Sequence, residues 1–294
     1  MSFAQNQQEN KGLPFAQIFR MKEGMSDGCL IVIPARLAST RLPGKALLPI
    51  DGTPMIVHVL RRAEAAGCGR VIVAAGDRAI VRAVEDAGGE AVLTPRRLTT
   101  GSDRVFAACE ICDPKQRYQT IINLQGDLPH LPPRLLTQLL AALRPADDIV
   151  TPVAPMRSAH DARNVAIVKA VVAWHPPSPS RPSRASRPSR APRPSSGSSG
   201  RAVYFSRAAV PHGAQLWFHH IGVYLWRRHA LERFAHLAPS PLEKSEQLEQ
   251  LRALAVGMAI RALRVPRAVT GIDTAAQLAA VRRHWVRGKA HAPA

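Results

Sequence analysis

The sequence is poor in acidic residues, aromatic residues and cysteine, and it contains no long apolar run. Aspartate and glutamate together number 21 against 40 lysines and arginines, so the formal charge is +19 over 294 residues. Because no apolar run approaches the ~18 residues that a bilayer-spanning helix needs, we expect no membrane span. The polar start of the chain lacks the apolar core of a signal peptide, which favours a cytoplasmic protein.

The four cysteines do not form a metal-binding pattern. Cys109 and Cys112 make one isolated C-x-x-C inside an expected helix, and no second pair completes a zinc site. Cys29 and Cys68 lie in an expected strand and at an expected helix end. We interpret all four as small apolar side chains of a protein from a reducing compartment.

Much of the positive charge lies in a proline- and serine-rich tract and at the C-terminus. The arginines in or beside the tract are Arg181, Arg184, Arg187, Arg190, Arg193 and Arg201. Such a composition buries too little apolar surface to fold, so we expect a disordered insertion over 175–200. Its three-residue arginine spacing matches the polyproline II turn and leaves two interpretations: a docking arm for RNA or acidic lipid, or a tolerated surface insertion between two strands. We also expect a disordered extension over 1–26 and a short tail over 287–294.

Apolar strands alternate with helical patterns in the first half of the chain. The expected strands are 30–33, 70–75, 90–93, 120–124 and 148–153, and the expected helices between them are 54–66, 77–87, 102–111 and 132–143. Further along, we expect strands over 165–174, 202–206, 221–226 and 259–265 and helices over 242–256 and 275–286. This order predicts right-handed crossovers, hence an α/β, Rossmann-like fold with a mixed, mainly parallel sheet flanked by helices and a small substrate lobe.

A cationic loop follows the first expected strand. The segment IPARLASTRLPGK, from Ile33 to Lys45, contains Arg36, Arg41 and Lys45. Ligands of open α/β sheets bind beyond the carboxyl ends of the strands, and clustered cations beside Gly44 suit a phosphate chain. The segment does not match G-x-x-x-x-G-K-[ST], which argues against a P-loop NTPase. The alternative is a solvated basic loop.

Two aspartates are candidate magnesium ligands. Asp127, in INLQGDLP, follows an apolar strand and therefore falls at the same edge of the sheet. A carboxylate beside a cationic phosphate loop is a hard-oxygen ligand for Mg²⁺, although Gly-Asp also suits a plain turn. Asp273, in VTGIDTAAQL, precedes a helix, so it either caps that helix or supplies a second carboxylate to the same metal.

Together these segments resemble the 3-deoxy-D-manno-octulosonate (Kdo) cytidylyltransferases, the CMP-Kdo synthetases of Gram-negative bacteria. The resemblance runs from Met25 to about Arg283, apart from the arginine tract. Its motifs are IPARLASTRLPGK, GTPMIVHVLRRA, TTGSDR, NLQGDLP, VYFSRAAVP, HHIGVY, SPLEKSEQLEQLR and GIDTAAQL. In the family the residue after the aspartate of QGD is usually acidic, and here it is Leu128.

The resemblance implies the fold, the reaction and the assembly. The fold would be that of a glycosyltransferase-A-like nucleotidyltransferase, one domain over 27–286 with a nucleotide half at about 27–155 and a sugar-binding and dimerisation half at about 156–286. The reaction would join CTP and Kdo into CMP-Kdo and pyrophosphate for lipopolysaccharide biosynthesis, in a homodimer that requires neither nucleic acid nor a membrane. Two alternatives remain: another acidic sugar such as 8-amino-Kdo or sialic acid, or a non-catalytic protein that binds polyanions through its arginine tract.

The resemblance also implies residue roles, with Arg36, Lys45 and Asp127 as the catalytic group. The triphosphate would be held by Arg36, Arg41 and Lys45, and the cytosine would be seated by Gly101, Ser102 and Arg104. Magnesium would be held by Asp127 and Asp273, and Kdo would be surrounded by Gln125, Arg207, His220, Tyr224, Glu249 and Gln250. On the helix expected over 242–256, Glu246 and Glu249 are three residues apart and should share one face.

Overall fold

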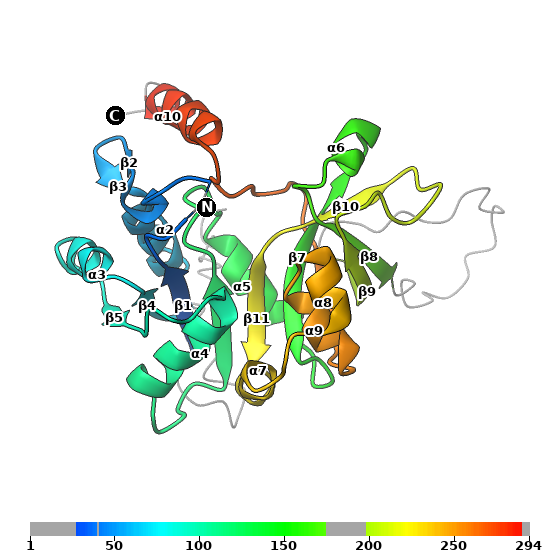
Figure 1. The fold of residues 1–294 in the computed structure, drawn as a ribbon, viewed down its shortest axis with the longest axis horizontal. Helices are drawn as coiled ribbons and strands as arrows, with labels where there is room; N and C mark the ends of the chain where they lie inside the picture. The colour runs from blue at the N-terminus through cyan, green and yellow to red at the C-terminus, as the bar shows by residue number, and fades with distance from the viewer. Residues whose placement is uncertain (1–27, 40, 175–197, 290–294) are drawn as a thin grey trace, which may run out of the picture.

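The computed structural model describes residues 28–39, 41–174 and 198–289. Within these residues, one ten-stranded sheet crosses the molecule in the order β10-β8-β9-β12-β7-β11-β6-β1-β4-β5 (Figure 1). Its strands are β1 (Cys29–Ala35), β4 (Gly69–Ala75), β5 (Ala91–Leu93), β6 (Thr120–Leu124), β7 (Ile149–Met156), β8 (Lys169–Trp174), β9 (Ser199–Ser206), β10 (Trp217–His220), β11 (Val223–Arg227) and β12 (Ile260–Arg264). A separate hairpin joins β2 (Pro49–Ile50) and β3 (Thr53–Pro54).

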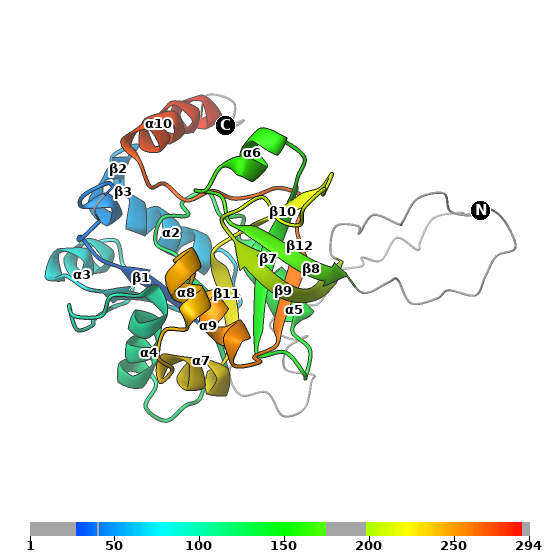
Figure 2. The same cartoon turned by 45° about the vertical axis from the view of Figure 1, so that its right-hand side comes forward.

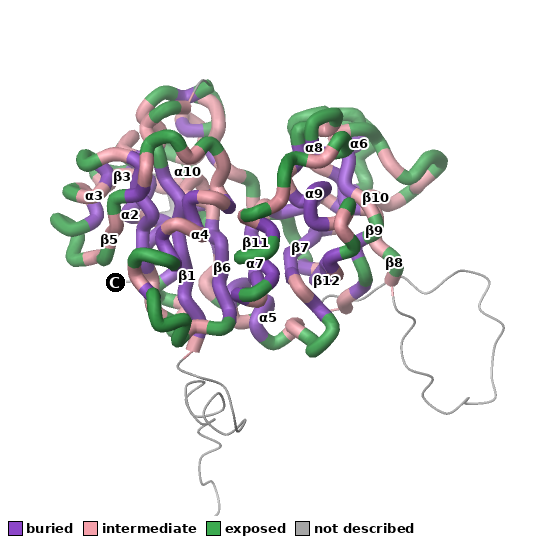
Figure 3. Tube along the Cα trace, turned by 60° about the horizontal axis from the view of Figure 1, so that its bottom comes forward, coloured by how far each residue is buried: buried purple, intermediate pink, exposed green. Residues whose placement is uncertain are grey.

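Helices cover both faces of the sheet. They are α2 (Met55–Glu64), α3 (Arg78–Glu85), α4 (Gly101–Cys112), α5 (Arg134–Ala142), α6 (Ala159–Arg163), α7 (Arg228–Ala235), α8 (Pro241–Glu246), α9 (Gln250–Ala255) and α10 (Ala275–Lys289), with a 3-10 turn η1 (Lys45–Leu47). Alternate residues of a strand point to opposite faces. In β1, Ile31 and Ile33 share a core with α2, α3 and α5, whereas Leu30 and Val32 share a core with α4, α7 and α9. Figure 3 shows β1, β6 and β7 buried along most of their length.

The sheet is mixed, as the sequence predicts, but it is mainly parallel only in its first half. There β5, β4, β1 and β6 run parallel. In the second half, β12 pairs in parallel with β7, while β8, β9, β10 and β11 make antiparallel pairs. The expectation of a mainly parallel arrangement is therefore wrong for the second half, because its antiparallel pairs, such as β6 with β11 and β9 with β12, join strands far apart in the chain, whose relative direction no local pattern displays. The parallel half places the carboxyl ends of β1, β4 and β6 side by side at one edge.

The predicted helix over 242–256 is wrong as a single element. The chain forms α8 and α9, which are separated at Gln247, a residue in the left-handed region with a φ of 53°. A buried ion pair between Arg252 and Glu243, with distances of 2.6 and 2.8 Å, holds the two short helices together. Because the helix breaks at Gln247, Glu246 ends α8 and Glu249 precedes α9, and the two glutamates do not share a helix face.

Other boundaries also differ from the prediction. The hairpin β2–β3, the strand β10 and the helices α6 and α7 were not predicted, and β8 begins at Lys169 rather than at residue 165. The strand β9 includes residues 199–200 of the expected insertion, and α10 continues through residues 287–289 of the expected tail. The remaining predictions for 1–26, 175–197 and 290–294 lie outside the described residues.

The C-terminal helix α10 returns to the first half of the chain. Figure 2 shows α10 beside the β2–β3 hairpin, and the Arg282 guanidinium donates to the Pro49 carbonyl at 2.6 and 2.8 Å. The Trp285 ring lies 4.5 Å from the ring of His58 and 4.7 Å from that of His130, measured between ring centroids. This docking brings the segment before α10, which contains Asp273, to the edge where the parallel strands end. Among the described residues, no helix has the length and apolar character to cross a bilayer.

Candidate active site

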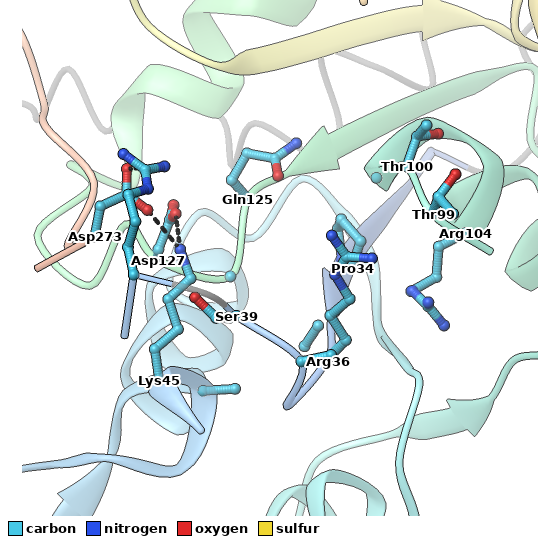
Figure 4. Close-up of a pocket in the computed structure, with 16 residues that line it drawn as sticks. Pro34, Arg36, Ser39, Lys45, Thr99, Thr100, Arg104, Gln125, Asp127 and Asp273 are labelled. Atoms are coloured by element: carbon cyan, nitrogen blue, oxygen red, sulfur yellow. Dashed lines mark hydrogen bonds and ion pairs between the residues drawn. The ribbon is translucent and has the colours of Figure 1, made fainter. Parts of the chain in front are cut away.

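The carboxyl ends of the parallel strands open into a cavity of about 310 Å³ (Figure 4). The segments after β1, β5 and β6 and before α10 supply its walls. It is lined by Pro34, Ala35, Arg36, Ala38, Ser39, Arg41, Lys45, Ala46, Thr99, Thr100, Gly101, Arg104, Gln125, Gly126, Asp127 and Asp273. Eight of the fourteen site residues expected from the sequence lie here: Arg36, Arg41, Lys45, Gly101, Arg104, Gln125, Asp127 and Asp273.

Lys45 joins the two candidate metal ligands at one end of the cavity. Its ammonium donates to Asp127 Oδ2 at 2.6 Å and to Asp273 Oδ1 at 2.9 Å, and Arg41 pairs with Asp273 Oδ2 at 3.1 Å. Burial alone would lower the pKa of Lys45, but the two carboxylates outweigh it and raise that pKa above its ordinary value. Lys45 is therefore a fixed positive charge, and the solvated-loop alternative is wrong for it.

Local structure explains why these three side chains converge. Gly44, with a φ of 67°, turns the loop so that η1 starts at Lys45. The carbonyl of Asp127 accepts a hydrogen bond from the Ile272 N–H at 3.0 Å, which ties the two aspartate segments together. A Cβ at Gly271 would lie 3.0 Å from Asp127 Oδ1, so a glycine allows this close approach.

Asp273 is not the cap of α10. A reciprocal capping pair starts that helix instead: Thr274 Oγ1 accepts from the Gln277 N–H at 3.2 Å, and Gln277 Oε1 accepts from the Thr274 N–H at 3.0 Å. Gln277 Oε1 also accepts from the Asp273 N–H at 2.8 Å. The Asp273 carboxylate thus stays available for Lys45 and Arg41. The T-x-x-Q spacing of Thr274 and Gln277 marks this capping pair in the sequence, so it is the signal by which Gln277 could be predicted.

The residues present fit a divalent cation. Asp127 and Asp273 converge on one point, and a cation, the Lys45 ammonium, already lies there in the structure. The described residues contain no group of three or more His, Cys, Asp or Glu side chains that would form an all-protein metal cage. Two carboxylates alone match Mg²⁺, which keeps several waters and takes its other ligands from substrate phosphates.

Arg104 lies across the cavity from Lys45, and Arg36 lies between them (Figure 4). Arg104 donates to Thr94 Oγ1 at 2.6 Å and to the Leu98 carbonyl at 2.8 Å, so its guanidinium also holds the loop between β5 and α4. Burial and the nearby charge of Arg36 lower the pKa of Arg104. Thr100 caps α4 by accepting from the Asp103 N–H at 3.1 Å, which brings Gly101 to the cavity wall.

Five of the six remaining expected residues form a second group that does not line the cavity: Ser102, His220, Tyr224, Glu249 and Gln250. Tyr224 donates to Gln250 Oε1 at 3.2 Å, and Gln250 Nε2 lies 3.5 Å from the ring of His220. Ser102 donates to Glu249 Oε2 at 3.2 Å. Burial lowers the pKa of His220 to about 3 and raises the pKa values of Tyr224 and Glu249. His220 is therefore neutral, and burial disfavours the charged forms of Tyr224 and Glu249.

Gln125 connects the two groups. It lines the cavity and donates to Asn123 Oδ1 at 3.0 Å, and Asn123 is the register partner of Tyr224 in the sheet. A Cβ at Gly101 would lie 3.4 Å from Gln125 Nε2, and one at Gly222 would lie 3.8 Å from its Cγ.

Arg207 lies apart from both groups. Its guanidinium donates to the carbonyls of Glu246 at 2.9 Å, Val165 at 3.0 Å and Gln247 at 3.3 Å. The backbone turn between α8 and α9 thus provides two of its partners. Since a guanidinium has five N–H donors, two of those of Arg207 have no partner among the described residues. The sequence did not reveal this environment, because it depends on the break at Gln247.

The fold is that of a nucleotidyltransferase. A family model described as cytidylyltransferase matches residues 30–260, and the chain belongs to this family. The solved structure of a CMP:2-keto-3-deoxy-manno-octonic acid synthetase complexed with CTP resembles the chain with a TM-score of 0.75 and 34% identity, over 89% of this chain and 100% of that one. A nucleotidyl transferase from Methanothermobacter thermautotroptrophicus, 14% identical with a TM-score of 0.53 over 89% of this chain and 99% of that one, shares the fold.

The relatives found by sequence carry a more specific name than the family model does. The chain is 49% identical over 255 residues to the 3-deoxy-manno-octulosonate cytidylyltransferase of Nitrobacter hamburgensis, which covers 86% of this chain and 91% of that protein. It is 49% identical over 260 residues to the enzyme of the same name from Parvibaculum lavamentivorans, covering 88% and 93%. The resemblance that the motifs predicted is confirmed.

Proposed function

We propose that the protein transfers the cytidylyl group of CTP to Kdo, forming CMP-Kdo and pyrophosphate. One observation carries this proposal: in a chain 49% identical to enzymes of that name, a cationic loop and a carboxylate pair share one cavity. Both substrates are anions, so their approach requires positive charge. Lys45, Arg36 and Arg41 supply it from the chain itself.

The chain's own side chains would orient the reactants. Arg36, Arg41 and Lys45 hold the triphosphate and stabilise the charge that develops on the leaving pyrophosphate, so catalysis is mainly alignment and electrostatics. Arg104 and Gly101 seat the base at the other end of the cavity. Mg²⁺ held by Asp127 and Asp273 would neutralise phosphate charge and make the attacking sugar hydroxyl more acidic.

The sugar acid would bind beyond Gln125, beside the buried group of His220, Tyr224 and Gln250. A neutral His220 offers a hydrogen bond without adding charge, and Arg207 offers the carboxylate the two N–H donors that have no partner among the described residues. We propose these residues as the Kdo site on the strength of the family resemblance and of their connection to the cavity through Gln125. Ser102 would act through Glu249, to which its hydroxyl donates.

Pyrophosphate release tests the proposal. The purified protein, Mg²⁺ and CTP are incubated with Kdo, with 8-amino-Kdo or with sialic acid, and release is compared with a reaction that lacks sugar. We expect release with Kdo, at a higher kcat/KM than with the other two acids. Release with none of them would refute the proposal, whereas a preference for another acid would assign the alternative substrate.

We also propose a cytoplasmic homodimer, which the family resemblance supports. Sedimentation equilibrium at micromolar concentration should give twice the chain mass of 31.9 kDa. A monomer mass that persists as the concentration rises would contradict the assembly without touching the proposed reaction.

A further inference from the structure

Asp77 occupies a helix-cap position but does not act as a cap. It follows β4, has an extended backbone with φ −142° and ψ 139°, and precedes α3, yet its side chain accepts no hydrogen bond from that helix. An aspartate at this position usually accepts from an N–H in the first turn of its own helix. Here the carboxylate turns to two other segments, and the side chain is only 12% exposed.

The first contact is with the cationic loop. Asp77 Oδ2 accepts from the Leu37 N–H at 2.9 Å, and the Leu37 carbonyl accepts from the Gly44 N–H at 3.1 Å. Arg36 directly precedes Leu37, and Lys45 directly follows Gly44. Two successive hydrogen bonds therefore tie both ends of this loop to the end of β4.

The second contact concerns charge. Asp77 Oδ1 pairs with Arg96 at 3.0 Å, and the Asp77 charge also acts on Arg104, where it opposes the effects of burial and of Arg36. The backbone next to Asp77 lies close to two of the three cavity arginines: a Cβ at Gly76 would lie 3.0 Å from an Arg104 guanidinium nitrogen and 3.3 Å from Arg36 Cβ. A carboxylate beside these two positive charges reduces their mutual repulsion while no substrate is bound.

We propose that Asp77 is a positioning residue of the nucleotide site, which fixes Arg36 and Lys45 in the geometry that receives the triphosphate. It does not line the cavity, so it acts through these side chains and not on substrate. The inference rests on the proposed function for the identity of the nucleotide. The effect of removing the Asp77 carboxylate on CTP affinity separates two roles. By charge alone, removing a carboxylate near a polyanion site strengthens binding, whereas the loss of a positioning residue weakens it.

Three variants separate these effects. Asp77→Ala removes the acceptor for the Leu37 N–H, whereas Asp77→Asn keeps an acceptor of the same shape and removes the charge. Asp86→Asn is the matched control, because Asp86 is an exposed residue at the other end of α3. CTP affinity is measured by titration calorimetry in the presence of Mg²⁺, amide hydrogen exchange is followed at Leu37 and Gly44, and kcat and KM are taken from pyrophosphate release.

We expect Asp77→Ala to weaken CTP binding by about tenfold or more, because hydrogen bonds to charged groups are worth ~1.5–3 kcal/mol. The weakening should appear in KM for CTP more than in kcat, and Leu37 and Gly44 should exchange faster. Asp77→Asn should recover most of the affinity, and Asp86→Asn should match the unmodified protein.

Unchanged or tighter CTP binding by a folded Asp77→Ala protein would overturn the inference. So would an Asp77→Asn protein as weak as Asp77→Ala, since the role would then belong to the charge and not to the bond to Leu37. If the unmodified protein itself does not bind CTP, the proposed function fails instead, and the exchange rates of Leu37 and Gly44 still test the tie between Asp77 and the loop.

Discussion

Replacement of Lys45 by methionine tests the charge arrangement at the centre of the site. The ammonium makes hydrogen bonds of 2.6 and 2.9 Å to Asp127 and Asp273, and charge-assisted bonds are worth ~1.5–3 kcal/mol each when buried. The three side chains are 21%, 20% and 32% exposed, so solvent screening reduces this value. We expect Lys45→Met to lower the free energy of unfolding by about 2 kcal/mol, which corresponds to a decrease in Tm of ~4–8 °C.

The same variant should respond to divalent cations more strongly than the unmodified protein. In the variant the two carboxylates face one another without the competing ammonium, so Mg²⁺ alone should bind more tightly and recover part of the lost stability. A ligand at ten times its Kd contributes about 1.4 kcal/mol. Turnover with CTP and Kdo should nevertheless fall, because the triphosphate loses one of its cations.

Thermal unfolding with and without millimolar Mg²⁺ measures both effects. Lys115→Met is the matched control, since Lys115 is exposed and lies beyond the end of α4. An equal Mg²⁺-induced rise in Tm for Lys45→Met and the unmodified protein would show that the Lys45 ammonium does not compete with Mg²⁺ for the two carboxylates. A Lys45→Met protein that is no less stable than the control in the absence of metal would refute the reasoning.

Two further predictions concern the second half of the chain. The pKa of His220 is about 3 in the folded state and ~6.5 when unfolded, so the unfolded state binds more protons and stability falls as pH drops below about 6.5, by up to about 1.4 kcal/mol per pH unit. His220→Asn should reduce this pH slope in urea unfolding, and an identical slope would exclude His220 as its source. The buried Lys169 ammonium donates to the carbonyls of Asn164, Ile167 and Arg207, so Lys169→Met should cost about 3 kcal/mol, against near-neutrality for the exposed Lys244→Met. A Lys169→Met midpoint equal to that of Lys244→Met would contradict this assignment.

The first half of the fold was predictable because its strands are buried on both faces and read as continuous apolar runs. The expected strand over 120–124 coincides with β6. The other strands and helices expected in this half differ from the observed ones by a few residues at most, and only the short β2–β3 hairpin and the turn η1 were not expected. In the second half, β10 and α7 were missed. The pairing of β10 with β7 is set by residues far apart in the chain, which no local pattern displays. The break between α8 and α9 was likewise hidden, because Gln247 adopts the left-handed conformation where a glycine would have marked the end of a helix.

Part of the site was predictable for the same reason. Arg36 and Asp127 directly follow apolar strands, so the edge rule for open sheets places them together from the sequence alone. Asp77 also follows a strand at that edge, but an aspartate before a helix looks like an ordinary cap. The convergence of Asp273 on Asp127 depends on the docking of α10 through Trp285, a contact between segments more than 200 residues apart in the chain.

The most direct test of the proposed reaction measures binding and turnover on one Asp127→Asn protein. Asparagine keeps the shape of the side chain and removes one of the two carboxylates that converge on Lys45. The proposal predicts that CTP still binds within about tenfold of the unmodified protein, while kcat for pyrophosphate release falls by at least ~10²-fold, the scale of a lost electrostatic group in a transition state. Asp86→Asn should keep full activity. An Asp127→Asn protein that is folded, binds CTP and turns over at the unmodified rate would contradict the proposed role of the two carboxylates in the reaction.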